Sequence, residues 1–306
     1  MFIDHALSAR IESVEAAQLE GLVRAVSARL PEHGAACAFV AGGCAAFLGQ
    51  HVPVSRAVGL GMTAPVEAAD VEALESFYRS RGTEARILVS PYADESLLAR
   101  LGERGFRLVD LDTVLVRRLA AAEPRTARPA EGAAPLAVRV VPPEDGAAWV
   151  RTSLAGFAPP GEAPALERAP AFEAGFHAVG VVFLAASIAG VDAGGGALHC
   201  HGRTAQLFAA STLPAFRGRG VQAALLGARL ALARGAGCDL AFAGTAPGSA
   251  SQRNFERWGF APAYSQALLV KRFDGEAGAA PEGLRSRQAD ADRYVPPSRM
   301  EGLPRP

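Results

Sequence analysis

Lysine and long apolar runs are scarce in this sequence, and each scarcity excludes a class of protein. A single lysine, Lys271, stands among 31 basic residues, and no Gly-Lys-Ser/Thr sequence enters a helix. This excludes a phosphate-binding loop of the Walker type. The longest apolar run, residues 178–191, has 14 residues and contains glycines, whereas a membrane-spanning helix needs about 20. The sequence therefore predicts no membrane association.

Net charge and paired cysteines are also missing. The 31 basic and 31 acidic residues cancel, so no basic surface for nucleic acid is expected. Cys37, Cys44, Cys200 and Cys238 show neither a C-x-x-C spacing nor a zinc-type His-Cys cluster. The N-terminal residues lack the regions of a signal peptide. We expect no metal, four reduced thiols and a cytoplasmic protein.

The chain is long enough for two domains of ordinary size, since it has 306 residues of which 50% are hydrophobic. Residues 120–135 contain three prolines and no apolar periodicity, which is typical of a linker. From residue 274 onward large apolar residues almost vanish, which predicts a disordered tail. The expected organisation is a first unit at 1–119, a linker at 120–135, a second unit at 136–273 and a tail at 274–306.

Apolar periodicity and turn residues predict alternating helices and strands in both units. In the first unit we expect helices at 6–30, from 63–65 to 82, and 95–104, with strands at 36–41, 44–48, 57–62, 86–90, 107–109 and 113–118. In the second we expect helices at 145–155, 165–176, from 221, and up to 258, with strands at 137–141, 181–186, 191–199, 204–211, 240–243, near 263, and 267–273. The order predicts an α/β protein.

An internal repeat links the two units. Gly105-Phe106 precedes the segment VLVRRL at residues 114–119, and Gly259-Phe260 precedes LLVKRF at 268–273. Both pairs are separated by 154 residues without a gap. The order of elements before each pair also agrees, so the sequence predicts a duplicated fold.

Residues 207–226 carry the strongest functional pattern, in which a strand, a Pro-containing turn and a glycine-rich loop lead directly into a helix. The loop reads Arg217-Gly218-Arg219-Gly220. Glycines let a ligand approach the backbone, and the first N–H groups of a helix have no partner inside it. A helix start flanked by two arginines favours the binding of a diphosphate.

A dinucleotide-binding loop is one interpretation of this pattern. Gly218, Gly220 and Ala223 fit G-x-G-x-x-A, and Asp239 lies 21 residues beyond Gly218. However, the acidic residue of that fingerprint should close the following strand, whereas Asp239 precedes the strand expected at 240–243. The interpretation stays open as an alternative.

Residues 212–222, TLPAFRGRGVQ, resemble the acetyl-CoA loop of the GNAT superfamily of N-acetyltransferases, Arg/Gln-x-x-Gly-x-Gly/Ala after a strand and a proline. Arg217 and Gly220 match, and Gln222 stands where that family usually has Gly or Ala. Residues 248–260, ending in Trp258-Gly259-Phe260, are similar to a later helix of the same family that flanks the pantetheine arm. The resemblance implies two tandem GNAT-like domains, each a mixed, mostly antiparallel sheet flanked by helices.

Only the second unit has this loop. At the matching place the first unit has VGLGMTAP at residues 58–65, with no arginine and with Pro65 at the expected helix start. We therefore expect acetyl-CoA to bind only the second unit. The resemblance places the cofactor against these residues: Thr212, Leu213, Arg217, Gly218, Arg219, Gly220, Val221, Gln222, Ser251 and Asn254.

The resemblance implies direct attack of an amine on the acetyl-CoA thioester, without a covalent enzyme intermediate. A tyrosine of the family often protonates the leaving thiolate, but Phe255 stands at that position here. Tyr264 is the nearest alternative general acid. The strand before the loop offers Ala205, Gln206 and Leu207, with no glutamate to act as base.

The expected function is an N-acetyltransferase acting on an amine of a small molecule or peptide. The composition of the sequence indicates a bacterial source. A non-catalytic acyl-CoA sensor or scaffold is the alternative from another class, because the family's usual tyrosine and glutamate are missing.

Overall fold

The structure, a computed structural model, describes residues 3–50, 52–120, 135–159 and 161–273. The predicted linker at 120–135 lies outside these residues except at its two ends, and the predicted tail at 274–306 lies wholly outside them.

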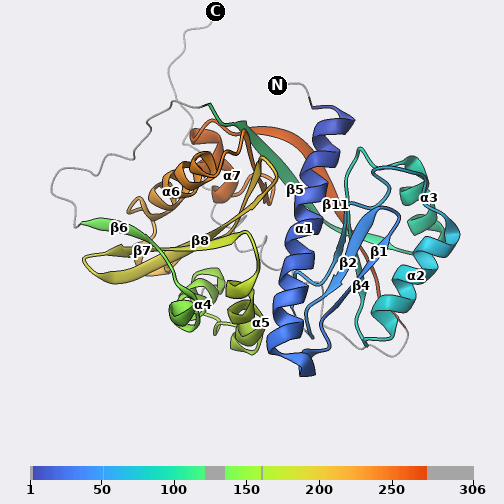
Figure 1. Cartoon of the computed structure of the whole chain (residues 1–306), viewed down its shortest axis with the longest axis horizontal. Coiled ribbons are helices and arrows are strands. Elements are labelled where there is room, and N and C mark those ends of the chain that lie inside the picture. The colour runs from blue at the N-terminus through green and yellow to red at the C-terminus, as the bar shows by residue number, and fades with distance from the viewer. Residues whose placement is uncertain (1–2, 51, 121–134, 160, 274–306) are drawn as a thin grey trace, which may run out of the picture.

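One mixed β-sheet runs through the whole described chain, and helices cover both of its faces (Figure 1). The predicted α/β class is thus confirmed. The strands are β1 (Ala36–Val40), β2 (Gly43–Phe47), β3 (Ala57–Val58), β4 (Ala85–Val89), β5 (Arg107–Arg118), β6 (Leu136–Val140), β7 (Val181–Ile188), β8 (Val191–His201), β9 (Thr204–Thr212), β10 (Leu240–Thr245) and β11 (Ala261–Lys271).

The strand order is β1-β2-β3-β4-β11-β5-β10-β9-β8-β7-β6. β5, from the N-terminal half, therefore lies between β11 and β10, and β11, from the C-terminal half, lies between β4 and β5. Each half gives its last strand to the sheet of the other. β5 and β11 pair antiparallel with each other from Ala261↔Val116 to Val270↔Arg107. The segments that repeat at a separation of 154 residues thus meet at the centre of the sheet.

Several predicted boundaries need correction. β5 and β11 are each one long strand, not two, because they pair with each other along their length, with two register shifts, and this holds their polar middles extended. The strand expected at 57–62 is only two residues long, since a glycine with φ +72° follows Val58. The helix expected from 63–65 begins at Ala68, beyond Pro65.

The helices divide into those that cover one half of the sheet and one that covers parts of both. α2 (Ala68–Arg79) and α3 (Glu95–Glu103) pack on β4, while α6 (Val221–Gly235) and α7 (Ala250–Arg257) pack near β9 and β10. α4 (Gly146–Phe157) and α5 (Ala169–Ala174) lie on the opposite face of the C-terminal half from α6 (Figure 1). The helix expected at 165–176 is shortened to α5, with 3₁₀ turns on either side.

α1 (His5–Arg29) is a single helix that crosses the middle of the sheet. Asp4 starts it, because its carboxylate accepts a hydrogen bond from the Leu7 amide at 2.8 Å. The helix contacts β2 of the N-terminal half and β8 and β9 of the C-terminal half. Since both halves lie beneath it, α1 buries polar as well as apolar side chains, among them Glu12, Glu15 and Gln18.

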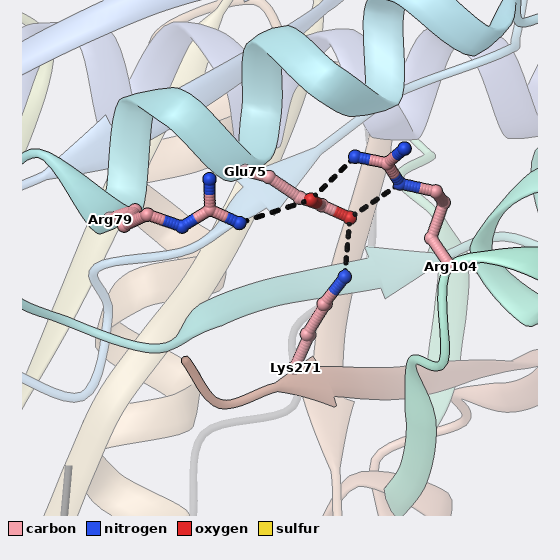
Figure 2. Close-up of polar contacts among 4 residues, drawn as sticks. All are labelled: Glu75, Arg79, Arg104 and Lys271. Atoms are coloured by element: carbon pink, nitrogen blue, oxygen red, sulfur yellow. Dashed lines mark hydrogen bonds and ion pairs between the residues drawn. The ribbon is translucent and has the colours of Figure 1, made fainter. Parts of the chain in front are cut away.

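An ion cluster holds the exchanged strand β11 against α2. The Glu75 carboxylate on α2 accepts from Lys271 Nζ on β11 at 2.8 Å and, in a two-pronged contact, from Arg104 at 3.0 and 2.8 Å (Figure 2). Arg79 adds a contact at 3.4 Å. The only lysine of the chain is therefore part of a structural ion cluster.

Three successive glycines of β8 make room for groups on both faces of the sheet. A Cβ at Gly195 would lie 2.4 Å from Trp149 Nε1 on α4, and one at Gly196 would lie 3.2 Å from Arg229 Cζ on α6. The opposite faces of one strand thus receive a tryptophan and a fully buried arginine. These glycines are needed for helix packing.

Candidate functional site

The glycine-rich loop lies between the end of β9 and the start of α6, as the sequence predicted. A 3₁₀ turn, Pro214–Phe216, precedes it. Gly218 and Gly220 have φ of +75° and +82°, and a Cβ on either would meet no atom within 4 Å. Left-handed backbone favours glycine here, and the space above it is open.

The start of α6 presents unpartnered amides. Gly220 is its N-cap, and no described side chain caps it, unlike α1 and α7, where Asp4 and Ser249 accept amide hydrogens. The amides of the first turn, including those of Val221 and Gln222, have no acceptor within the helix. Together with the positive end of the helix dipole, they form a site suited to an anion.

The two loop arginines have different orientations. Arg217 turns back toward the protein, where its guanidinium donates to the carbonyl oxygens of Thr212 at 3.4 Å and Gly156 at 3.3 Å. Arg219 is exposed, and its Cζ lies 5.5 Å from the centre of the Phe216 ring. Arg217 thus braces the loop against α4, and Arg219 is the arginine at its open side.

Hydrogen bonds fix the strand that enters the loop. Gln222 Nε2 donates to Thr212 Oγ1 at 2.8 Å, which ties the first turn of α6 to the end of β9. The Leu213 amide donates to the Ala193 carbonyl at 2.9 Å. The Leu213 amide is therefore already used, and the Leu213 carbonyl accepts from the Phe216 amide at 2.9 Å.

β9 and β10 separate next to the loop. They pair in parallel only from Leu240↔Thr204 to Phe242↔Gln206, although β9 runs on to Thr212 and β10 to Thr245. The register of β9 with β8 shifts in this part, where Ala209 has φ +48°. Two strands that diverge leave backbone groups between them that can bind an extended ligand.

The corresponding segment of the N-terminal half is closed. The Gly61 amide donates to the Ala41 carbonyl at 3.0 Å, and the Gly61 carbonyl accepts from Asp94 at 2.8 Å. Leu60 and Met62 are buried. Gly61 therefore already uses its backbone donor and acceptor within the protein. That only the second loop binds a cofactor stays a prediction.

The remaining predicted residues lie on α7 and β11. Ser251 is exposed at the start of α7, and Asn254 Oδ1 accepts from Arg257 at 2.9 Å. Tyr264 lies on β11, two strands from β10, and its buried hydroxyl donates to Glu12 Oε1 at 3.1 Å. Burial is the largest cause that raises its pKa. Its role as a general acid stays a prediction.

Asp239 precedes β10 and lies at the opposite end of that strand from the open loop. Its carboxylate pairs with Arg10 and with Arg203, the latter at 3.1 Å. A ribose-binding acid of a dinucleotide site would stand at the carboxyl end of the strand, so the geometry does not favour that alternative.

A largely apolar cavity of about 350 Å³ lies on the α4 side of the sheet, beside the separating part of β9. Both halves of the chain line it, with Leu22 of α1 and Val54 from the N-terminal half facing Trp149 and Phe157 of α4. Its polar lining residues are Gln18, Arg56, Ser153, Arg168 and Gln206. A pocket of this kind accommodates an apolar group.

Sequence reasoning missed a pair of buried carboxylates, Glu12 and Glu15, behind this cavity. Gln266 Nε2 bridges them, 2.9 Å from Glu12 Oε1 and 2.9 Å from Glu15 Oε2. Burial and mutual repulsion raise the pKa of Glu12, and burial raises that of Glu15. The signal in the sequence was two acids, three apart, beside the apolar residues Ile11 and Val14 of a helix that buries a wide face.

No protein-family profile and no curated protein sequence matches the chain. Solved structures do match. A GCN5-related N-acetyltransferase from Kribbella flavida aligns with a TM-score of 0.59 and 18% identity, over 88% of this chain and 97% of that one. A tandem GNAT protein from the clavulanic acid biosynthesis pathway aligns with a TM-score of 0.49 and 16% identity, over 69% of this chain and 70% of that one.

This chain has the fold of the GCN5-related N-acetyltransferases, with a mixed sheet flanked by helices as expected, while the tandem arrangement of two domains stays a prediction. Among the residues that the structure describes, no helix is long and apolar enough to cross a membrane. Within the same residues, no three His, Cys, Asp or Glu side chains gather as metal ligands would.

Proposed function

We propose that this protein is an N-acyltransferase that moves an acetyl or related acyl group from acyl-CoA to an amine of a small molecule or peptide. The observation that carries the proposal is the open, uncapped start of α6 beside the point where β9 and β10 separate. The diphosphate would lie on the amides of residues 219–222, and the pantetheine arm between the two strands. Acetyl-CoA would be a co-substrate, and no metal is needed for this chemistry.

The cavity supports a site for the acceptor on the other side of the same opening. It contacts Gln206, Phe208 and Ala209 of β9, the segment where pairing with β10 stops. An amine there would reach a thioester held between the strands. Since the lining is mainly aromatic and aliphatic, we propose that the acceptor carries an apolar group next to its amine.

We further propose that the chain is a tandem duplication, with GNAT-like units at 1–119 and 136–273. The strand order supports it, because β4 to β1 on one side and β10 to β6 on the other flank the central strands β11 and β5. The first unit would contribute α1 and the loop at Arg56 to the acceptor cavity and bind no CoA itself. The cytoplasmic location stays a prediction from composition.

Isothermal titration calorimetry with acetyl-CoA, NAD and ATP tests the cofactor assignment. Gly220→Asp places a carboxylate beside the expected diphosphate. At about 5 Å and an effective dielectric constant of about 20, two unit charges repel by about 3 kcal/mol. Solvent exposure reduces this, so we expect acetyl-CoA to bind at least about tenfold more weakly.

Gly237→Asp is the matched control, because Gly237 lies just beyond the other end of α6, has φ +78° and faces open space. It should bear the same backbone strain without changing acetyl-CoA affinity. Tighter binding of NAD than of acetyl-CoA would overturn the proposal. Binding of acetyl-CoA without release of CoA to any amine would favour the sensor alternative.

A further inference from the structure

The carboxylate pair is close to the reacting centre of the proposed site, although it belongs to the N-terminal half. Glu15 Oε1 lies 3.4 Å from Gln206 Nε2 and 3.9 Å from the Arg56 guanidinium. Both partners line the cavity. Gln206 is also the last residue of β9 that pairs with β10. Glu15 thus adjoins the cavity at the point where the opening between the strands begins.

The cavity itself provides no proton acceptor. Among the described residues that line it there is no carboxylate, and two of its five polar residues are arginines. Their positive charge disfavours an ammonium ion and favours the neutral amine. A bound amine would therefore give up its proton readily, and Glu15 is the carboxylate nearest to receive it.

We propose that Glu15 is the proton acceptor for the amine that this site acylates. The proposal rests on the acyltransferase function proposed above. In that reaction the glycine-rich loop of the C-terminal half would bind the cofactor, and α1 of the N-terminal half would supply the base.

The surroundings distinguish the two carboxyl groups. Glu12 Oε2 is buried without a hydrogen-bond partner, whereas both Glu15 oxygens face donors. Arg56 favours the ionised form of Glu15, and Asp112 on β5 opposes it.

Tyr264 donates to Glu12. His199 on β8, opposite Gln206, stays neutral because burial lowers its pKa to about 4. Two buried carboxylates this close share one proton, so Glu12 holds it and Glu15 carries the charge.

The step balances without a further reactant. Ionised Glu15 takes a proton from the ammonium through one water, and the neutral amine remains. Its lone pair forms the C–N bond with the thioester carbonyl carbon, and the tetrahedral intermediate collapses with cleavage of the C–S bond. The thiolate takes the second proton from nitrogen and leaves as CoA, and Glu15 returns the first proton to solvent.

The test compares two nucleophiles that differ in their need for a base. 2-Phenylethylamine is an ammonium ion at neutral pH and carries an apolar ring, whereas hydroxylamine is already mostly neutral. CoA release from acetyl-CoA is measured with each. In Glu15→Gln we expect kcat/KM for 2-phenylethylamine to fall about 100-fold, while the rate with hydroxylamine stays within about threefold. An equal loss for both nucleophiles, or no loss, overturns the role of Glu15.

Glu12→Gln is the matched control. Its amide oxygen can accept the same two hydrogen bonds from Tyr264 and Gln266, and it resembles the protonated acid. We expect it to keep kcat/KM for 2-phenylethylamine within about threefold at neutral pH. Activity lost to the same degree as in Glu15→Gln would assign the pair a structural role and refute the proposal.

The wild type provides a test that needs no folded Glu15 variant. Its kcat/KM for 2-phenylethylamine should decrease at low pH as Glu15 is protonated, more steeply than the change in ammonium fraction predicts. Arg56→Met should move this decrease to higher pH, because Arg56 lowers the pKa of Glu15. A profile without that decrease refutes the inference. A wild type that releases no CoA to either nucleophile refutes the acyltransferase proposal instead.

Discussion

Replacing Glu75 by Gln should remove a pH-dependent part of the stability. The Glu75 side chain is only 2% exposed and accepts hydrogen bonds from Arg104, Lys271 and Arg79 (Figure 2). Hydrogen bonds from Arg104 are the largest cause that lowers its pKa, from 4.5 to about 2. The folded state therefore favours the ionised carboxylate more than the unfolded state does.

The magnitude follows from this difference in pKa. A shift from 4.5 to about 2 corresponds to at most about 3 kcal/mol, at about 1.4 kcal/mol per pKa unit. Arg79, Arg104 and Lys271 are 58%, 44% and 23% exposed, so solvent screens part of the interaction and we expect about 2 kcal/mol. Because the folded-state pKa is lowered, this stability is complete above pH 4.5 and decreases as the pH falls toward 2.

Urea unfolding of the wild type and Glu75→Gln, at a series of pH values between about 7 and about 3, measures this contribution. The difference in unfolding free energy should be about 2 kcal/mol at neutral pH and about half of that near pH 3. Glu72→Gln, at an exposed position of the same helix, is the control and should change stability by less than about 0.5 kcal/mol. A difference between wild type and Glu75→Gln that does not vary with pH would refute the reasoning.

Two further predictions concern packing and the contact between the halves. Gly195→Ala should destabilise the protein by about 2 kcal/mol, because the alanine Cβ would lie 2.4 Å from Trp149 Nε1. Urea unfolding followed by tryptophan fluorescence measures this loss of stability. Gly235→Ala is the control, and because open space surrounds Gly235 it should not lower the stability. The Arg10–Asp239 pair is 37% and 39% exposed, so a double-mutant cycle should give at most about 1 kcal/mol, decreasing with salt. A coupling that salt leaves unchanged would contradict this.

The sequence allowed the glycine-rich loop between a strand and a helix to be predicted, because that signal is local. Gly218 and Gly220 are close in the chain, and their left-handed backbone is a property of the turn itself. The repeat at a spacing of 154 residues is also visible in the sequence, and its two copies lie on the paired strands β5 and β11. Such patterns need no knowledge of contacts that are distant in the sequence.

The exchange of β5 and β11 and the carboxylate pair were not predictable in the same way. The apolar pattern of β5 is the same whether it pairs with β4 or with β10. Glu12 and Glu15 resemble the polar flank of an amphipathic helix until the second half of the chain covers them. Gln266, which bridges them, lies 251 residues beyond Glu15, so only the folded chain shows that they are buried together.

The exchanged strands also determine the order in which the chain can fold during synthesis. β4 and β5 do not pair with each other, and each takes β11 as a neighbour. Both neighbours of β5 come from the C-terminal half, so until β10 and β11 are made, both edges of β5 and one edge of β4 stay uncovered. Such edges invite wrong pairing between chains, so we expect the nascent chain to depend on a chaperone more than a protein of two independently folding halves would.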